Sequence, residues 1–371
     1  MFKIHHTDAF ITIREWLDDI SYSTLNRYMM KFLDQAGQLY PDFYKFIGII
    51  DRINPFYAFI LSVLRIGQPT ERESLEKFLS AEIIEALLET GLLEQKEKYF
   101  KMPQVGILPL GGMYFITSLP ETYPTSLRNN KYKPVDQAVQ LAIDAIESQP
   151  MGEDFLEVYS DYGILANMAA TKGFKNIQIQ PKHPDCIPFI QMNLALNHHE
   201  GVVITDCCAN KYDLIACINL SVKDKIEGRN QKIEDENTIN QLLPVFRQLK
   251  DEGKAIVLLE SVGTISEIKI NERLKVMDGF NIQSVVLNKI PYPALALSGY
   301  VQTSWERQFD LVPCDYIEYV KKTIKSSESI VFVFTQLLKF SKRKKDEPFI
   351  LYPFYNPKYS DPLFNYASSL V

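Results

Sequence analysis

The first part of the chain has apolar residues at helical spacing. Segments 11–20, 24–36 and 41–53 each carry one apolar and one polar face, which predicts amphipathic helices. Pro55 interrupts this pattern, and a further apolar helix follows up to Leu64. The segment before residue 65 is therefore predicted to be almost entirely helical.

Two more helices and a small hairpin are predicted before residue 120. Thr70 followed by Glu73 is a capping-box pattern, so we expect one helix to start there. A second helix covers residues 81–90 and ends at Gly91. Three short extended segments follow, at 92–95, 99–103 and 112–117. This order of elements is typical of a winged-helix domain.

A winged helix raises the question of DNA binding. The second helix contains Ala-Glu-Ile-Ile-Glu-Ala-Leu-Leu-Glu at residues 81–89, without any Arg or Lys to contact phosphate. The formal net charge of −6 gives no general attraction to nucleic acid or to an anionic membrane. We therefore expect residues 1–120 to be a packing or substrate-covering domain, without a nucleic-acid or membrane partner.

Beyond residue 134 the pattern changes to strands that alternate with helices. Residues 121–134 are polar and rich in turn formers, and we interpret them as a linker. Helices are predicted at 134–148, 164–172, 187–197 and 239–250, and strands at 155–159, 176–180, 202–205, 214–218, 255–259, 282–287 and 330–338. This alternation predicts an α/β, Rossmann-like domain over residues 135–345, with a doubly wound, mostly parallel sheet. Residues 346–371 form an aromatic tail, which we expect to pack on the body or on a partner.

Several short motifs follow the predicted strands in a fixed order. Residues 157–163 contain Glu-Val-Tyr-Ser-Asp-Tyr-Gly, and residues 193–197 contain Asn-Leu-Ala-Leu-Asn. Asp206 follows the third strand, and residues 212–215 contain Tyr-Asp-Leu-Ile. This series resembles the class I S-adenosylmethionine (SAM)-dependent methyltransferases, in the small-domain group of N-methyltransferases. The resemblance implies SAM as the cofactor.

The resemblance also assigns candidate residues. Glu157 occupies the position of the acidic residue that ends the first strand in the family. Gly163 corresponds to the last glycine of the loop, and Asp206 corresponds to the acidic residue after the third strand. Tyr159 and Asp161 occupy two positions at which the family has glycine. The family needs glycine there because the backbone turns tightly and lies close to the ligand. Their side chains would occupy space used by the methionyl part of SAM, although Asp161 could instead pair with the amino group of the ligand.

Two further positions depart from the family pattern. Gln180 ends the second strand in place of the acid that binds both ribose hydroxyls, and it lacks the paired acceptors of a carboxylate. The family continues from residue 215 to Asn-Pro-Pro-Tyr, whereas Asn219 falls one place late here and should face the other side of the strand. Methylation of an amide or base nitrogen by the usual route is therefore not expected. The cofactor-binding candidates are Glu157, Asp161, Gly163, Gln180 and Asp206, and the catalytic candidates are Asn219 and Tyr159, with the aromatic loop at 292–305 above them.

Two functional hypotheses remain open. The first is a SAM-dependent methyltransferase, or a divergent descendant with altered chemistry, that acts on a small molecule or a peptide. The second is a pseudo-methyltransferase that serves as a binding or scaffold subunit, with a protein partner or as a homo-oligomer. The loss of three ligand-contacting motifs in a chain that keeps its strand and helix patterns favours the second, and the retained acids favour the first.

Cysteine and histidine positions bear on metals and on the compartment. The five cysteines form no Cys-x-x-Cys pair, so neither a disulfide framework nor a zinc site is expected. His198 and His199 are adjacent and point in different directions, so we expect no shared metal. The first residues lack the apolar segment of a signal peptide, and we expect a cytoplasmic protein.

Overall fold

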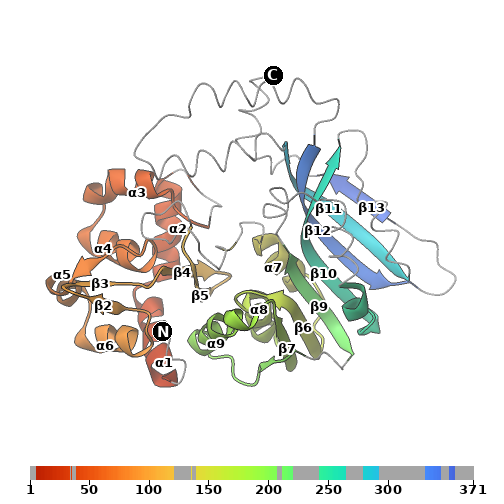
Figure 1. Cartoon of the computed structure of the whole chain (residues 1–371), viewed down its shortest axis with the longest axis horizontal. Helices are drawn as coiled ribbons and strands as arrows, with labels where there is room; N and C mark the ends of the chain where they lie inside the picture. The colour runs from red at the N-terminus through yellow and green to blue at the C-terminus, as the bar shows by residue number, and fades with distance from the viewer. Residues whose placement is uncertain are drawn as a thin grey trace. The chain divides into compact units, whose positions relative to one another are not determined.

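The computed structural model divides the chain into two compact units, whose elements are labelled in Figure 1. It describes residues 6–33, 35, 39–120, 135, 139–206, 211–219, 242–264, 279–291, 331–343 and 351–355. Unit 1 comprises Met1–Gln140, Ser160–Thr171 and Pro181–Ile204, and unit 2 comprises Leu141–Tyr159, Lys172–Gln180 and Thr205–Val371. The domain boundaries suggested by the sequence, at residues 120, 135 and 346, stay a prediction.

Helices make up the first part of unit 1. They are α1 (Thr7–Asp19), α2 (Tyr22–Phe32), α3 (Phe43–Ile49), the short η1 (Ile50–Arg52) and α4 (Pro55–Leu64). Pro55 occupies the first turn of α4, and the side chain of Asn54 accepts a hydrogen bond from Phe56 N. The helices expected from hydrophobic periodicity are confirmed here, and the proline marks the start of a helix.

A small mixed region follows in the chain. It contains β1 (Thr70–Glu71), α5 (Arg72–Phe78), α6 (Ala81–Glu89), β2 (Glu94–Lys96) and β3 (Tyr99–Lys101), with the three strands in the order β1-β3-β2. The expected capping box is wrong, because Thr70 pairs with Phe100 in the sheet and α5 begins after Glu71, which makes no side-chain cap. The two helices and the hairpin are present, and their assignment to a winged helix stays a prediction.

A second hairpin of unit 1 is formed by β4 (Val105–Leu110) and β5 (Met113–Ser118). The sequence predicted only its second strand, because Gly106 and Pro109 interrupt the first. Gly106 is needed here, since a Cβ atom would lie 3.2 Å from the carbonyl oxygen of Leu64 and 2.7 Å from the side chain of Leu119. Unit 1 also contains most of α8 (Ile164–Lys172), together with η2 (Pro184–Cys186), α9 (Ile187–Leu196) and β8 (Val203–Ile204).

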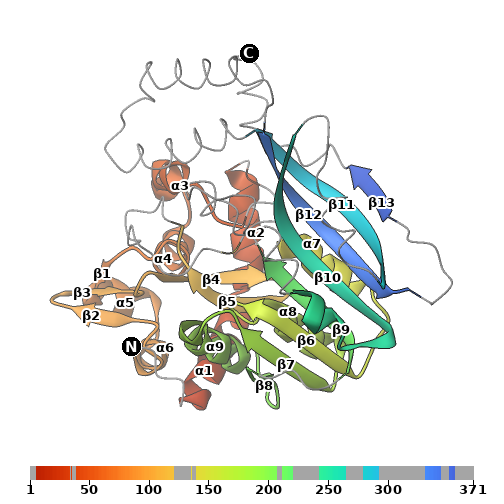
Figure 2. The ribbon, with the colours of Figure 1, turned by 45° about the vertical axis from the view of Figure 1, so that its right-hand side comes forward.

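The large sheet gives the chain its fold class (Figure 2). Its other strands are β6 (Asp154–Ser160), β7 (Asn176–Pro181), β9 (Tyr212–Asn219), β10 (Leu249–Thr264), β11 (Phe280–Pro291), β12 (Val331–Lys342) and β13 (Leu351–Tyr355), preceded by α7 (Val139–Glu147). The strand order is β13-β11-β12-β10-β9-β6-β7-β8. If β6 to β10 are numbered 1 to 5 in chain order, their order across the sheet is 3-2-1-4-5. This is the strand order of doubly wound folds. The expected α/β class with a mostly parallel sheet is confirmed.

The sheet extends further than the sequence patterns indicated. β10 begins at Leu249, so the helix expected up to residue 250 is wrong at its end, although residues 242–246 are helical. β12 runs antiparallel between β10 and β11. β13 lies within the segment interpreted as a tail and pairs in parallel with β11, with Leu351 opposite Ile282. Part of the expected tail is therefore a strand of the sheet.

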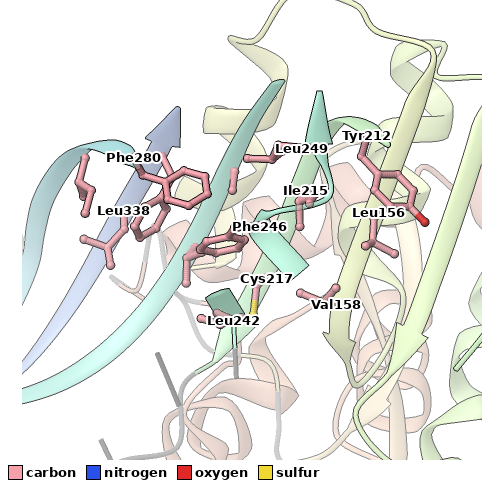
Figure 3. Close-up of a cluster of buried hydrophobic side chains, with 14 residues drawn as sticks. Leu156, Val158, Tyr212, Ile215, Cys217, Leu242, Phe246, Leu249, Phe280 and Leu338 are labelled. Carbon is pink, nitrogen blue, oxygen red and sulfur yellow. The ribbon is translucent and has the colours of Figure 1, made fainter. Parts of the chain in front are cut away.

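The core of unit 2 is a cluster of buried side chains on one face of the sheet (Figure 3). Leu156 and Val158 of β6 and Ile215 and Cys217 of β9 alternate along their strands, so each pair faces the cluster. The ring of Phe246 lies 4.9 Å from that of Phe340 on β12 and 6.2 Å from that of Phe280 on β11, measured between ring centroids. These aromatic contacts pack the helical segment 242–246 against β11 and β12.

Candidate functional site

The order of the strands locates the candidate site. In doubly wound sheets, ligands bind outside the carboxyl ends of the strands, where the chain order reverses. Here the reversal lies between β6 and β9, which pair in parallel with Glu157 opposite Ala216. The candidate cofactor loop follows β6 directly, and Asn219 is the last residue of β9. The loop therefore occupies the expected ligand-binding edge.

Two residues of the loop have a left-handed backbone. The φ angle is 55° at Tyr159 and 70° at Gly163. Glycine adopts this conformation freely, whereas another L-residue pays about 1–2 kcal/mol for it. The hydroxyl of Ser160 accepts a hydrogen bond from Gly163 N at 2.8 Å, which fixes the turn into α8. The backbone thus adopts, at Tyr159, the conformation for which the resembled family uses glycine.

Both tyrosine rings of the loop belong to hydrophobic cores. Tyr159 is partly buried and packs against the core cluster of unit 2. Tyr162 is 5% exposed, and its hydroxyl accepts a hydrogen bond from Ser118 N in unit 1. Its ring meets Phe189 of α9 edge-on, 5.4 Å between centroids, and burial raises the pKa of the phenol. The two rings are therefore used in packing.

The Asp161 carboxylate has partners within unit 1. Oδ2 lies 3.3 Å from Nζ of Lys182, and Oδ1 accepts a hydrogen bond from the thiol of Cys186 at 3.6 Å. Burial and the nearby Asp161 charge raise the pKa of Cys186 to about 11, so this thiol is a donor and not a thiolate. A cationic amino group that approached Asp161 would compete with Lys182.

Sequence reasoning did not identify Lys182 and Cys186. They follow the second strand of the doubly wound order within six residues of Gln180, and this edge faces ligands in such folds. A lysine directly after that strand, combined with an acid in the loop after the first strand, is the signal that could have revealed the pair.

The other cofactor candidates lie on unit 2. Glu157 is 3% exposed within β6. Gln180 is partly buried at the end of β7, and its Oε1 atom is buried without a hydrogen-bond partner among the described residues. Thr205 N donates a backbone hydrogen bond to Ile179 O at 2.9 Å. Gln180 is the next residue after Ile179, and the exposed Asp206 is the next residue after Thr205. The structure thus gives the place of each of these three residues in or after a strand, while their roles stay predictions.

The catalytic candidates lie at the ends of neighbouring strands. Asn219 pairs with Leu259 of β10 in the parallel register, and Ile218 pairs with Leu258. The expectation that Asn219 faces the other side of the strand from Ile218 stays a prediction. The aromatic loop at 292–305 lies outside the described residues.

The two asparagines of the 193–197 motif cap the edge of the hairpin in unit 1. Asn193 Oδ1 accepts from Ile116 N at 2.7 Å, and its Nδ2 donates to Ile116 O at 3.2 Å. Asn197 makes the same pair of bonds with Tyr114, at 3.1 and 2.8 Å. Together with Tyr162, which binds Ser118 N, they satisfy alternate backbone groups along β5. This motif therefore serves to dock α9 on the hairpin.

A second polar cluster, at the amino ends of the strands, joins Asp154, Asp213 and Lys250. Nζ of Lys250 lies 2.6 Å from Asp154 Oδ2 and 2.8 Å from Asp213 Oδ2. Asp213 is the second residue of β9, at the opposite end from Asn219. In the resembled family, the motif at 212–215 precedes the catalytic segment. Here its acid, Asp213, pairs with Lys250 and accepts backbone hydrogen bonds at the amino end of β9.

The described residues contain no group of three or more His, Cys, Asp or Glu side chains that could hold a metal ion. His199 Nε2 lies 3.2 Å from the hydroxyl of Thr171, and burial, with Arg14 and His198, lowers the pKa of this imidazole. Among the helices described, none combines the length and the apolar character needed to cross a membrane.

No family model matches the chain, and no curated protein matches it. A ribosomal protein L11 methylase from Lactobacillus delbrueckii subsp. bulgaricus is similar in structure, at 16% identity and a TM-score of 0.32, over 56% of this chain and 80% of that chain. M. jannaschii TYW2, solved in complex with AdoMet, has 13% identity and a TM-score of 0.37, over 66% and 91%. M. jannaschii tRNA m1G37 methyltransferase has 11% identity and a TM-score of 0.39, over 71% and 65%.

These similarities are too weak to transfer an activity. The class of protein is defined by the strand order 3-2-1-4-5 and by the loop after its first strand. On that basis the chain is an α/β protein with a doubly wound, mostly parallel sheet.

Proposed function

We propose that the chain is a methyltransferase-like protein that binds SAM, or its demethylated product, at the carboxyl ends of β6 and β7. The observation that carries this proposal is Oε1 of Gln180, a buried acceptor without a partner among the described residues. A buried polar atom left without a hydrogen bond costs about 1–3 kcal/mol, so such atoms in native proteins call for a partner. A ribose hydroxyl at the end of β7 would supply the missing donor.

The residues present fit a reduced version of this ligand site. Gln180 can accept one hydroxyl, where a carboxylate would accept two. The chemistry that SAM supplies is an activated methyl group, and Asn219 and Tyr159 are the candidates beside it. We propose a small molecule or a peptide as the acceptor.

The test is a calorimetric titration of the full chain with SAM and with its demethylated product. We expect micromolar binding, about tenfold weaker in Gln180→Leu, because one hydrogen bond of about 1.4 kcal/mol is lost. Gln180→Glu should bind more tightly by a similar factor, since a charged acceptor forms the stronger bond. Lys175→Gln is the control, because Lys175 stands before the opposite end of β7 and is exposed. Absence of binding at millimolar ligand by the folded protein would overturn the proposal.

A second candidate function is a pseudo-methyltransferase that acts as a binding or scaffold subunit. The observation that favours it is the Asp161–Lys182 pair, because it neutralises the one acid of the loop that could meet the ligand's amino group. This function predicts that neither nucleoside binds and that the purified chain co-elutes with a protein partner or with itself. Asp206→Ala would then leave the biological activity intact, whereas the first function predicts weaker SAM binding in that variant.

A further inference from the structure

Unit 1 contains a fully buried arginine. Arg65 directly follows α4 and has a relative exposure of 0%. Its Nε donates to Oδ1 of Asn26 at 3.2 Å. Within the described part of the chain, neither Nη1 nor Nη2 has a partner at hydrogen-bond distance, although the guanidinium approaches the Tyr40 hydroxyl closely enough to act on the pKa of that phenol. Most of the five guanidinium N–H groups are therefore without a well-formed hydrogen bond.

The surroundings of this guanidinium are aromatic and neutral. Its central carbon lies 4.5 Å from the centroid of the Tyr40 ring. The Tyr40 hydroxyl is already bonded, to Thr117 Oγ1 at 3.0 Å and to Val135 N at 3.1 Å. Burial raises the pKa of Tyr22 and of Tyr40, while the charge of Arg65 acts in the opposite direction. Both phenols are therefore neutral, and neither balances the positive charge.

No carboxylate of the described residues compensates for the charge. The buried polar residues described in unit 1 are Asn, Gln, Ser and Thr, with Arg65 as the one charged member. An arginine cannot lose its proton in a protein, so burial cannot neutralise it. A cation–π contact offsets only part of the cost of removing a guanidinium from water. The site therefore calls for an anion.

We propose that the guanidinium of Arg65 binds the carboxylate of a ligand from solution. Nη1 and Nη2 form a planar fork whose spacing matches the two oxygens of a carboxylate. A monoanion fits better than a phosphate dianion, because the described surroundings contain one cation and a dianion would leave a net negative charge buried. This inference goes beyond the SAM site and does not rest on it, since every contact that supports it lies in unit 1.

Thermal unfolding of the full chain without SAM tests the proposal, with sodium acetate as the probe and sodium chloride at the same ionic strength as the reference. We expect a saturable rise in the unfolding temperature of about 2 °C at ten times the dissociation constant. Arg65→Met should lose this response. Arg65→Lys should retain part of it, because it keeps the charge and loses the fork. Arg52→Met, at an exposed arginine of the same unit, should respond like the wild type.

Three outcomes would overturn the proposal. The first is an equal acetate response in the wild type and in Arg65→Met, which would place the anion elsewhere. The second is a stronger response to phosphate than to acetate. The third is a large fall in the unfolding temperature of Arg65→Met in chloride alone, because a carboxylate of the chain itself would then have lost its partner. Titration of the same variants with SAM separates this result from the fate of the cofactor proposal.

Discussion

The carboxylate of Asp213 ties together the amino ends of neighbouring strands. Its Oδ2 accepts hydrogen bonds from Glu153 N, Asp154 N and Lys250 Nζ at 2.8, 2.9 and 2.8 Å. Burial acts to raise the pKa of Asp213, but the ammonium of Lys250 and the two backbone N–H groups outweigh it, so the pKa is lowered. A lowered pKa means that the folded state favours the charged carboxylate.

Asp213→Asn should therefore lower the free energy of unfolding by about 1–2 kcal/mol at neutral pH, after allowance for the partial exposure of the pair. The stability that the carboxylate contributes is complete above its unfolded pKa of about 4 and is lost as the pH falls through the lower folded value. Urea unfolding at pH 7, 5 and 2.5 measures this. The difference between wild type and variant should be equal at pH 7 and 5 and should shrink at pH 2.5.

The matched control for that series is Lys175→Gln, which removes an exposed pair with Glu153. It should change the free energy of unfolding by less than about 0.5 kcal/mol at every pH. An Asp213→Asn effect as small as the control, or independent of pH down to 2.5, would remove the stabilising role assigned to this residue.

Gly163 offers a second test at the residue scale. Its φ of 70° is unfavourable for any residue with a Cβ atom, so Gly163→Ala should cost about 1–2 kcal/mol of stability. Gly48 lies within α3, and a Cβ there would meet nothing within 4 Å, so Gly48→Ala should stabilise by about 0.5–1 kcal/mol. Chemical denaturation of both variants measures the pair, and effects of the same sign would contradict the backbone argument.

At the level of elements, the docking of α9 on β5 depends on individual side chains. Asn193→Ala removes both bonds to Ile116, and Asn197→Ala removes both bonds to Tyr114. Each change leaves buried backbone groups without partners, so we expect a loss of about 2–4 kcal/mol. Asn176→Ala, which removes an exposed bond to Asp154, should cost less than about 0.5 kcal/mol.

Amide hydrogen exchange gives this prediction a site-specific readout. Asn193→Ala should reduce the protection of Ile116 N–H more than that of Tyr114 N–H, and Asn197→Ala should do the reverse. Equal loss at both amides in both variants would indicate general destabilisation and would argue against two independent caps.

Elements defined by a local pattern were predictable from the sequence. The alternation around residues 155–159 identified β6, and helical spacing identified α9. β4 was missed because Gly106 and Pro109 weaken the strand pattern, and the glycine is explained only by the approach of Leu64 O. Thr70 has the chemistry of a helix cap, but it pairs with Phe100, which lies thirty positions away. Local signals could not report that competition.

The candidate site was predictable in part for the same reason. The loop, Gln180 and Asp206 were found because each follows a predicted strand. The partners of Asp161 were not found, because Lys182 and Cys186 reach it through the tertiary fold. The buried state of Arg65 was equally hidden, since a charged residue after an apolar helix is usually solvated.

At the scale of the whole molecule, β13 closes one side of the large sheet. It covers β11, a strand of twelve residues whose outer backbone groups would otherwise be unpaired. A chain that ends after residue 347 should therefore lose stability and associate in a concentration-dependent way. Light scattering after size exclusion measures this. A chain that ends after residue 357 keeps β13 and should behave like the full protein with respect to the β11 edge, and association of both would contradict the prediction.

The division into two units has a consequence for synthesis. The chain passes from one unit to the other five times, at residues 140/141, 159/160, 171/172, 180/181 and 204/205. Neither unit is a continuous piece of the gene, so neither can be exchanged or lost as a module. On the ribosome, β5 emerges long before the asparagines of α9 that cap its edge. The caps at Asn193 and Asn197 can form only after α9 has been synthesised, so the edge of β5 stays uncapped until then.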